Sequence, residues 1–296
     1  MTTLHLTEHD PEPVTVIDND SMLIFAGPHN GHAVPSCLPQ CLGTEPTWFD
    51  KAHEAVDLNM DKLFAALQNA NNADTDASYI YGNYSRLVCD LNATPDHAIT
   101  QRSSEFDDFK IPNNQPDQCC EQQYEDRLNT FYHPYHDAKK SLVDKTRAQH
   151  GGVILLDLHS FAPTWHQTQR EVEIGTLRHE KTHLSYALED YLKSQSAFNF
   201  VSGEPYRVAE RPHNAAAMIA ENNDLQYLGL EIRNDLIDTP EGVERMTAFI
   251  RGCVDYLMSH PDIDNIAAPL SHTTSAHNAH IYAAEDDTDM DSISPA

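Results

Sequence analysis

Short apolar runs, each followed by a polar segment, recur along the chain and predict buried strands. The clearest runs are residues 22–26 (MLIFA), 153–158 (VILLDL) and 227–232 (YLGLEI). A run that is apolar at nearly every position is typical of a strand buried on both faces of a parallel sheet. We expect a further pair of strands within residues 77–91 and a polar lead-in over residues 1–20.

Helical spacing of apolar residues predicts four helices between and after these runs. They cover residues 50–70, 124–148, 181–195 and 242–260, and Pro134 is expected to interrupt the second helix near its start. A polar, Pro-containing stretch over residues 103–122 predicts a surface loop. Strands that alternate with helices predict an α/β fold, here a three-layer αβα sandwich with a mixed, mainly parallel central sheet.

The composition changes near the C-terminal end of the chain. Residues after Pro261 are rich in Ala, Ser, Thr, His and Asp, and the last of them read AEDDTDMDSISPA. We therefore expect residues 1–266 to form a single catalytic α/β domain and residues 267–296 to form a polar, acidic tail of loose order. With 296 residues, 40% of them hydrophobic, the chain is long and apolar enough to bury a core.

The charge balance argues against two classes of partner. The formal net charge is -27 at pH 7. Binding to duplex nucleic acid or to an anionic membrane needs a basic surface, so neither is expected as a partner. The acid excess is equally consistent with a solubility role and with adaptation to salt.

Cysteine usage and the first residues bear on the compartment. The six cysteines form no CxxC pair, which favours reduced thiols over a disulfide framework. The first residues, MTTLHLTEHDPEP, lack the basic start and apolar run of a signal peptide. No apolar stretch approaches the roughly 20 residues of a membrane span. We expect a cytoplasmic protein.

Polar side chains follow the predicted strands at the edge where ligands bind in open α/β sheets. His29 comes just after the first strand, and His159 follows the VILLDL run. Two imidazoles with a carboxylate are typical ligands of catalytic zinc. The alternative is that these are two ordinary members of a set of 18 histidines. Asp157 is expected either to orient His159 or to be an ordinary buried Asp.

The end of the third strand carries Glu231 and Arg233. A carboxylate beside an activated water can act as a general base, and an Arg can bind a carboxylate or an oxyanion. The alternative for this pair is a structural salt bridge at the end of a strand. Spacing alone favours that structural role.

A set of motifs, in the right order, resembles the N-formylglutamate amidohydrolase family. Together they extend over most of residues 22–240. The matching segments are PHNGHAVP (28–35), VDLNMDKLF (56–64), YSRLVCDLN (84–92), YHPYH (132–136), LLDLHS (155–160), EIGT (173–176) and LEIRNDL (230–236). Each segment is a weak indication alone, whereas the ordered set is specific. The family is distantly similar to zinc carboxypeptidases, so a carboxypeptidase-like sheet is also expected.

The resemblance implies a role for each candidate residue. His29, Asp57 and His159 would be the zinc ligands, with Asp61 or His32 as alternatives to Asp57. Glu231 would be the general base. The residues expected to bind the substrate are Arg86, Asn92, His136 and Arg233. For Arg86, an ion pair with Asp90 is an equal alternative to substrate binding. For His136, a structural hydrogen bond is an equal alternative.

The implied activity is metal-dependent hydrolysis of a small N-acyl amino acid such as N-formyl-L-glutamate. One departure affects the substrate: the family's DLNR reads DLNA, with Ala93 in place of an Arg that could pair with a carboxylate. Arg207, Arg211 and Arg233 are the candidates to compensate for its loss. A deacylase or peptidase of other substrates and a non-catalytic binding protein remain the alternatives. Zinc is the expected cofactor, although another divalent transition metal could fill such a site.

Overall fold

The structure is a computed structural model of the whole chain. It describes residues 4–37, 57–70, 77–99, 102–103, 109–110, 114, 121–165, 167–178, 181–206 and 224–270. The expectation of a loosely ordered tail concerns residues 267–296, of which only 267–270 are described. The first part of the helix predicted over residues 50–70, and most of the surface loop predicted over 103–122, also lie outside these ranges.

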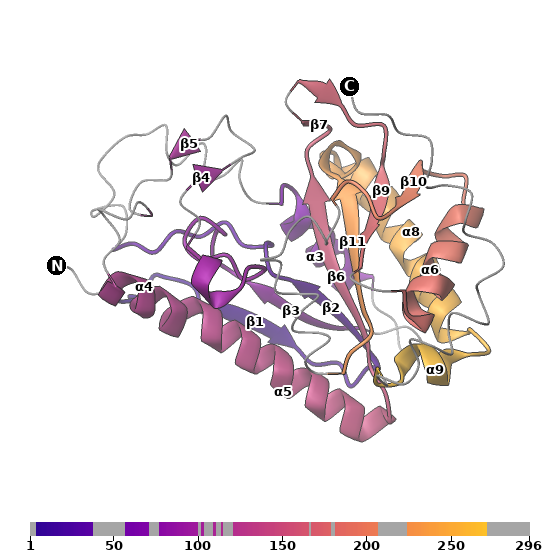
Figure 1. Cartoon of the computed structure of the whole chain (residues 1–296), viewed down its shortest axis with the longest axis horizontal. Coiled ribbons are helices and arrows are strands. Elements are labelled where there is room, and N and C mark those ends of the chain that lie inside the picture. Colours follow the sequence, from indigo (N-terminus) through magenta and orange to yellow (C-terminus); the bar gives the residue numbers. More distant parts are fainter. Residues whose placement is uncertain are drawn as a thin grey trace.

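A mixed sheet of seven strands forms the centre of the protein (Figure 1). Its order is β1 (Val14–Ile17), β3 (Ser78–Gly82), β2 (Leu23–Gly27), β6 (Ile154–Phe161), β11 (Tyr227–Arg233), β9 (Ile174–Leu177) and β10 (Phe200–Ser202). The four central strands β3, β2, β6 and β11 run parallel to one another. β1 pairs antiparallel with β3, and β9 pairs antiparallel with β11 and parallel with β10. The predicted mainly parallel sheet is therefore confirmed.

Helices cover both faces of the sheet (Figure 1). Alternate residues of a strand point to opposite faces, so the all-apolar runs contribute to two separate cores. One core contains α3 (Met60–Asn69), α6 (His183–Ser194), α8 (Pro240–Met258) and α9 (Ile263–Ala267). The other contains α5 (His133–His150) and the segment after β3. This is the three-layer arrangement predicted from the sequence.

Three local predictions were wrong or incomplete. Within residues 77–91 only β3 forms, and the chain then continues in turns rather than as a second strand. The lead-in contains strand β1, whose short VTVI run lies among polar residues. Pro134 does not break its helix, because α4 (Glu121–Arg127) passes through a π-helical segment (Leu128–Tyr132) and Pro134 lies in the first turn of α5, where no backbone N–H is needed.

Two small two-stranded sheets also lie in the described part of the chain. β4 (Arg102–Ser103) pairs with β5 (Phe109–Lys110), and β7 (Thr164–Trp165) pairs with β8 (Thr168–Gln169). The β7–β8 hairpin follows directly from the carboxyl end of β6 and stands above that edge of the sheet (Figure 1). Among the helices that the structure describes, none has the length and apolar character to cross a bilayer.

Candidate metal centre

Three residues distant in sequence meet at the carboxyl edge of the central strands. His29 lies two residues beyond β2, His159 lies within β6, and Asp57 lies in the turn before α3. One potential ligand atom from each lies within 4.8 Å of the others. All three side chains are buried, with 2%, 5% and 3% exposure for His29, Asp57 and His159. The residues proposed as ligands from the sequence are therefore brought together.

The loop that carries His29 is fixed by a neighbouring segment. Ala33 N donates to Asn83 O at 3.1 Å, and Ser85 N donates to Ala33 O at 2.9 Å. Two residues before Ala33, a Cβ on Gly31 would lie 2.1 Å from the backbone carbon of Asn83. Only glycine fits this close approach of two backbones. The loop after β2 is thereby held against the residues that follow β3.

A tight turn places Asp57 against β6. Asn59 adopts a left-handed conformation (φ 67°), which Asn tolerates better than most residues, and α3 begins directly after it. Asp57 Oδ2 accepts hydrogen bonds from Ser160 N at 3.2 Å and from His159 Nδ1 at 2.8 Å. Ser160 Oγ donates to Leu58 O at 2.9 Å, which ties the turn to the strand a second time.

His29 is oriented by a carboxylate that the sequence analysis did not assign to the metal site. Its Nε2 donates to Asp90 Oδ1 at 2.7 Å, while its Nδ1 faces Asp57 Oδ1 at 3.4 Å. Asp90 also accepts from Asn92 N at 2.9 Å and from Arg86 Nη2 at 2.9 Å. A carboxylate on the far nitrogen of an imidazole fixes its tautomer, as metal-binding histidines require. The available signal was the position of Asp90 within the DLN segment.

The charges of the site stabilise one another. Burial by itself would raise the pKa of the Asp57 and Asp90 carboxyls, but His29 acts on both, His159 on Asp57 and Arg86 on Asp90, so both pKa values lie far below the usual range. Burial lowers the pKa of His159, yet the hydrogen bond and charge of Asp57 outweigh it and raise that pKa to about 9.

The donor set fits a transition-metal ion. The Nδ1 atom of His29 is buried and makes no hydrogen bond with the described residues, although it faces Asp57 and the His159 ring. Two imidazoles and one carboxylate, held together at three fixed points, are typical ligands for catalytic zinc. The same set could take iron, cobalt or manganese.

Glu231 and Asp157 lie on the same face of the sheet as His159. Glu231 pairs with His159 in the β6–β11 register and is 4% exposed, and its charge contributes to the raised pKa of His159. Asp157 is fully buried, and neither of its oxygens makes a hydrogen bond with a described residue. It therefore acts on His159 through its charge, and the hydrogen bond expected of an orienting residue is absent.

The fallback ligands stay apart from the cluster. His32 Nε2 lies 3.5 Å from Asp61 Oδ1, and their side chains are 25% and 47% exposed. Neither belongs to the group of convergent ligand atoms found among the described residues. The arrangement thus favours Asp57 as the third ligand.

The residues expected to bind substrate take up different positions. Asn92 Nδ2 lies 3.5 Å from His159 Nε2, next to the cluster. Arg86 pairs with Asp90 and lies 3.5 Å from Asp57 Oδ1, so the ion pair considered for it is present. His136 packs on the Tyr132 ring with centroids 4.2 Å apart, and burial lowers its pKa to about 3.

Arg233 is engaged in structural contacts. Its guanidinium pairs with Asp235 at 2.8 Å and with Glu173 at 3.3 Å, and Nη1 donates to Arg170 O at 3.0 Å. This is the salt bridge at the end of a strand that the spacing favoured. Arg207 and Arg211, the other candidates to replace the guanidinium lost at position 93, lie outside the described residues.

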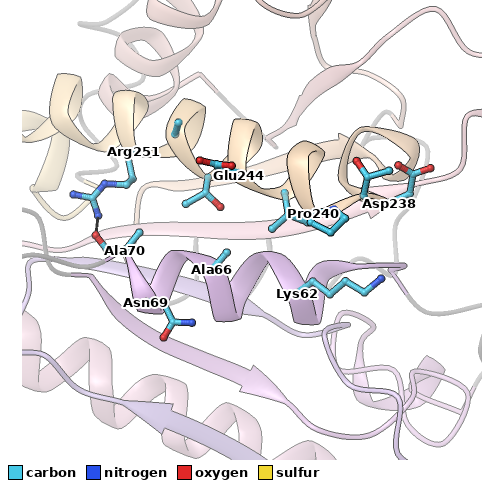
Figure 2. A pocket seen from close by; sticks show the side chains of 12 residues that line it. Lys62, Ala66, Asn69, Ala70, Asp238, Pro240, Glu244 and Arg251 are labelled. Carbon is cyan, nitrogen blue, oxygen red and sulfur yellow. Dashed lines mark hydrogen bonds between the residues drawn. The ribbon is translucent and has the colours of Figure 1, made fainter.

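A separate hollow of about 710 Å³ lies between α3 and α8 (Figure 2). Ala66, Pro240 and Val243 line it, with Lys62 and Glu244 at its margin. These helices cover the face of the sheet opposite to the one that bears His159 and Glu231. The hollow is therefore not part of the candidate metal centre.

The fold and the site define an α/β protein with a buried His-Asp-His cluster at the carboxyl edge of its parallel strands. The N-formylglutamate amidohydrolase family matches residues 21–238. The chain belongs to that family, which confirms the resemblance seen in the motifs.

The solved structures that share the fold include the following two. A gene product from Agrobacterium tumefaciens is 25% identical with a TM-score of 0.74, covering 86% of this chain and 98% of that one. An N-formylglutamate amidohydrolase from Ralstonia eutropha JMP134 is 17% identical with a TM-score of 0.60, covering 82% of this chain and 96% of that one. No curated protein matches the chain.

Proposed function

We propose that this protein hydrolyses the amide bond of a small N-acyl amino acid, of the N-formyl-L-glutamate type, with the help of a zinc ion. The observation that supports the proposal best is the convergence of His29, Asp57 and His159 beside Glu231. Membership of the N-formylglutamate amidohydrolase family supports the choice of substrate. The products would be formate and the free amino acid.

His29, Asp57 and His159 would hold the ion. When bound, zinc supplies a Lewis acid that polarises the scissile carbonyl and makes a water molecule more acidic. Asp90 keeps the His29 ring in one orientation, and the short bond from His159 Nδ1 to Asp57 Oδ2 restricts the second ring. The chain thus presents its ligands already arranged, which limits the cost of ordering them on binding.

Glu231 is the residue we assign to proton transfer. Its carboxylate would accept a proton from the attacking water and then deliver that proton to the amine nitrogen as the C–N bond breaks. The side chain extends from β11 on the same side as its partner His159, so the rigid sheet sets its position. The Asn92 amide, whose nitrogen lies 3.5 Å from His159 Nε2, would donate to an oxygen of the substrate.

The proposal is tested by separating metal binding from proton transfer. In Glu231→Gln we expect wild-type zinc content by elemental analysis and a loss of kcat for N-formyl-L-glutamate of about 10²–10⁴-fold. In His159→Ala we expect both zinc and activity to be lost. Full activity in a metal-free His29→Ala/His159→Ala protein would contradict the proposal.

A panel of N-formyl, N-acetyl and N-succinyl amino acids tests the acyl group. Ala93 motivates this panel, since the motif arginine at that position is replaced by a short side chain. Preference for an N-formyl substrate is expected. Hydrolysis of another acyl group alone would identify a different deacylase, and bound zinc without hydrolysis of any compound would identify a binding protein.

A further inference from the structure

Among the described residues, three guanidinium groups lie near the carboxyl edge of β6 and β11, and two of them are neutralised by carboxylates. Arg86 pairs with Asp90, and Arg233 pairs with Glu173 and Asp235. The third is Arg170, which follows the β7–β8 hairpin. Arg170 makes no ion pair with any described residue, in a chain whose net charge is -27.

Arg170 is held among aromatic rings instead of carboxylates. Its guanidinium carbon lies 4.9 Å from the centre of the Trp165 ring, 5.0 Å from that of Tyr206 and 5.3 Å from that of Phe161. Its Nη1 donates to Ala162 O at 3.1 Å and lies 3.4 Å from the Tyr206 hydroxyl. Within the described chain, Nε and Nη2 have no hydrogen-bond acceptor. The rings fix the group while leaving donors for an anion.

The position of Arg170 relates it to the metal centre. Phe161 and His159 are alternate residues of β6, so both side chains extend from the same face, with Cα atoms about 7 Å apart. Because Arg170 lies over the Phe161 ring, it is about one two-residue repeat of β6 beyond His159, towards the carboxyl end of the strand. Its backbone is fixed too, because Arg233 Nη1 donates to Arg170 O while Arg233 itself is paired with Glu173.

We propose that Arg170 binds the side-chain carboxylate of an acidic N-acyl amino acid whose amide lies at the metal centre. This inference rests on the function proposed above. Ala93 removes one guanidinium that could pair with the substrate, and Arg233 is occupied by its own carboxylates. Arg170 is the described guanidinium at this edge that retains both its charge and its donors.

The test compares N-formyl-L-glutamate with N-formyl-L-glutamine, which has nearly the same shape but no side-chain charge. In Arg170→Gln the ratio of kcat/KM for the two compounds should fall about 10–100-fold, which corresponds to the loss of one charged hydrogen-bonded contact. Arg170→Lys should restore part of the ratio, since it returns the charge without the planar fork. Arg245→Gln is the matched control, because Arg245 also stacks on a ring, that of Phe198 at 5.2 Å, but is exposed on α8.

Calorimetry on the metal-free protein separates this inference from the proposed activity. Wild-type protein should bind N-formyl-L-glutamate more tightly than N-formyl-L-glutamine, and Arg170→Gln should lose that preference. A preference retained in Arg170→Gln, or no preference in the wild type, overturns the assignment of Arg170. An equal loss of affinity for both compounds in Arg170→Gln also overturns it. That result would mean that Arg170 binds the α-carboxylate, which both compounds share, or that it supports the fold of the hairpin. Failure of the wild type to hydrolyse either compound refutes the activity, while the binding preference still decides the role of Arg170.

Discussion

Replacing Asp90 by Asn should weaken metal binding without changing the ligands themselves. Asp90 Oδ1 accepts from His29 Nε2 at 2.7 Å and Oδ2 accepts from Arg86 at 2.9 Å. Asn has the same size but replaces one oxygen by an NH₂ donor, so one of these contacts meets a donor instead of an acceptor. The loss of one hydrogen bond to a charged partner costs about 1.5–3 kcal/mol.

That free energy corresponds to about a 10–100-fold loss of zinc affinity, which agrees with the usual effect of removing a group that orients a metal ligand. The assay is a competition titration of purified protein against a chromophoric zinc chelator. Asp96→Asn is the control. This substitution makes the same change of charge six residues away, at an exposed position beside His97.

At saturating zinc, Asp90→Asn should recover most of its kcat, because proton transfer is assigned to Glu231 and the role given to Asp90 is to orient His29. Unchanged zinc affinity in this variant would refute the reasoning that Asp90 holds His29 in its metal-binding orientation. A loss of kcat that zinc does not restore would instead place Asp90 in the chemical step.

Three further predictions concern His159, Gly31 and Arg233. In metal-free protein the free energy of unfolding should fall as pH rises from about 6.5 to about 9, because the pKa of His159 is about 9 in the folded state and its ordinary value is 6.5. The stabilisation by protonated His159 is complete below pH 6.5. Urea titrations of His159→Gln at several pH values should show a flatter dependence of this free energy on pH. Gly31→Ala should lose about 1–3 kcal/mol in urea unfolding, since its Cβ would collide with the backbone of Asn83, and full stability would argue against that close approach. Arg233→Lys should reduce the preference for N-formyl-L-glutamate in kinetic assays, because the bond to Arg170 O is lost; an unchanged preference would show that Arg170 needs no such support.

Much of the fold could be predicted because three of its central strands begin with clear apolar runs. β2, β6 and β11 are buried on both faces, so their runs contain no polar interruption before the functional residues. β9 and β10 were not predicted, since strands of four and three residues are too short to show a period. β1 is an antiparallel edge strand with one exposed and three half-buried positions, and its polar surroundings hide it.

The metal ligands were predictable for a related reason. His29 follows strand β2, and His159 comes directly after the apolar run that begins β6. Parallel strands bring their carboxyl ends to one edge of the sheet. Asp57 could be named only through the family's acidic motif, because nothing in its local pattern shows that a turn will return it to β6. The 2.8 Å contact with His159 joins residues that are 102 positions apart.

The sequence by itself determined which segments are buried, the alternation that predicts parallel strands, and the order of motifs that places the chain in its family. Which charges pair was decided only by the tertiary structure. Arg233 has several acidic residues nearby in sequence, and the tertiary structure decides which of them it pairs with. Ionic contacts weaken with distance, so they form between groups that the fold holds together. For that reason Arg233 was expected at the substrate and is occupied by Glu173 and Asp235, while the aromatic surroundings of Arg170 emerged only from the folded chain.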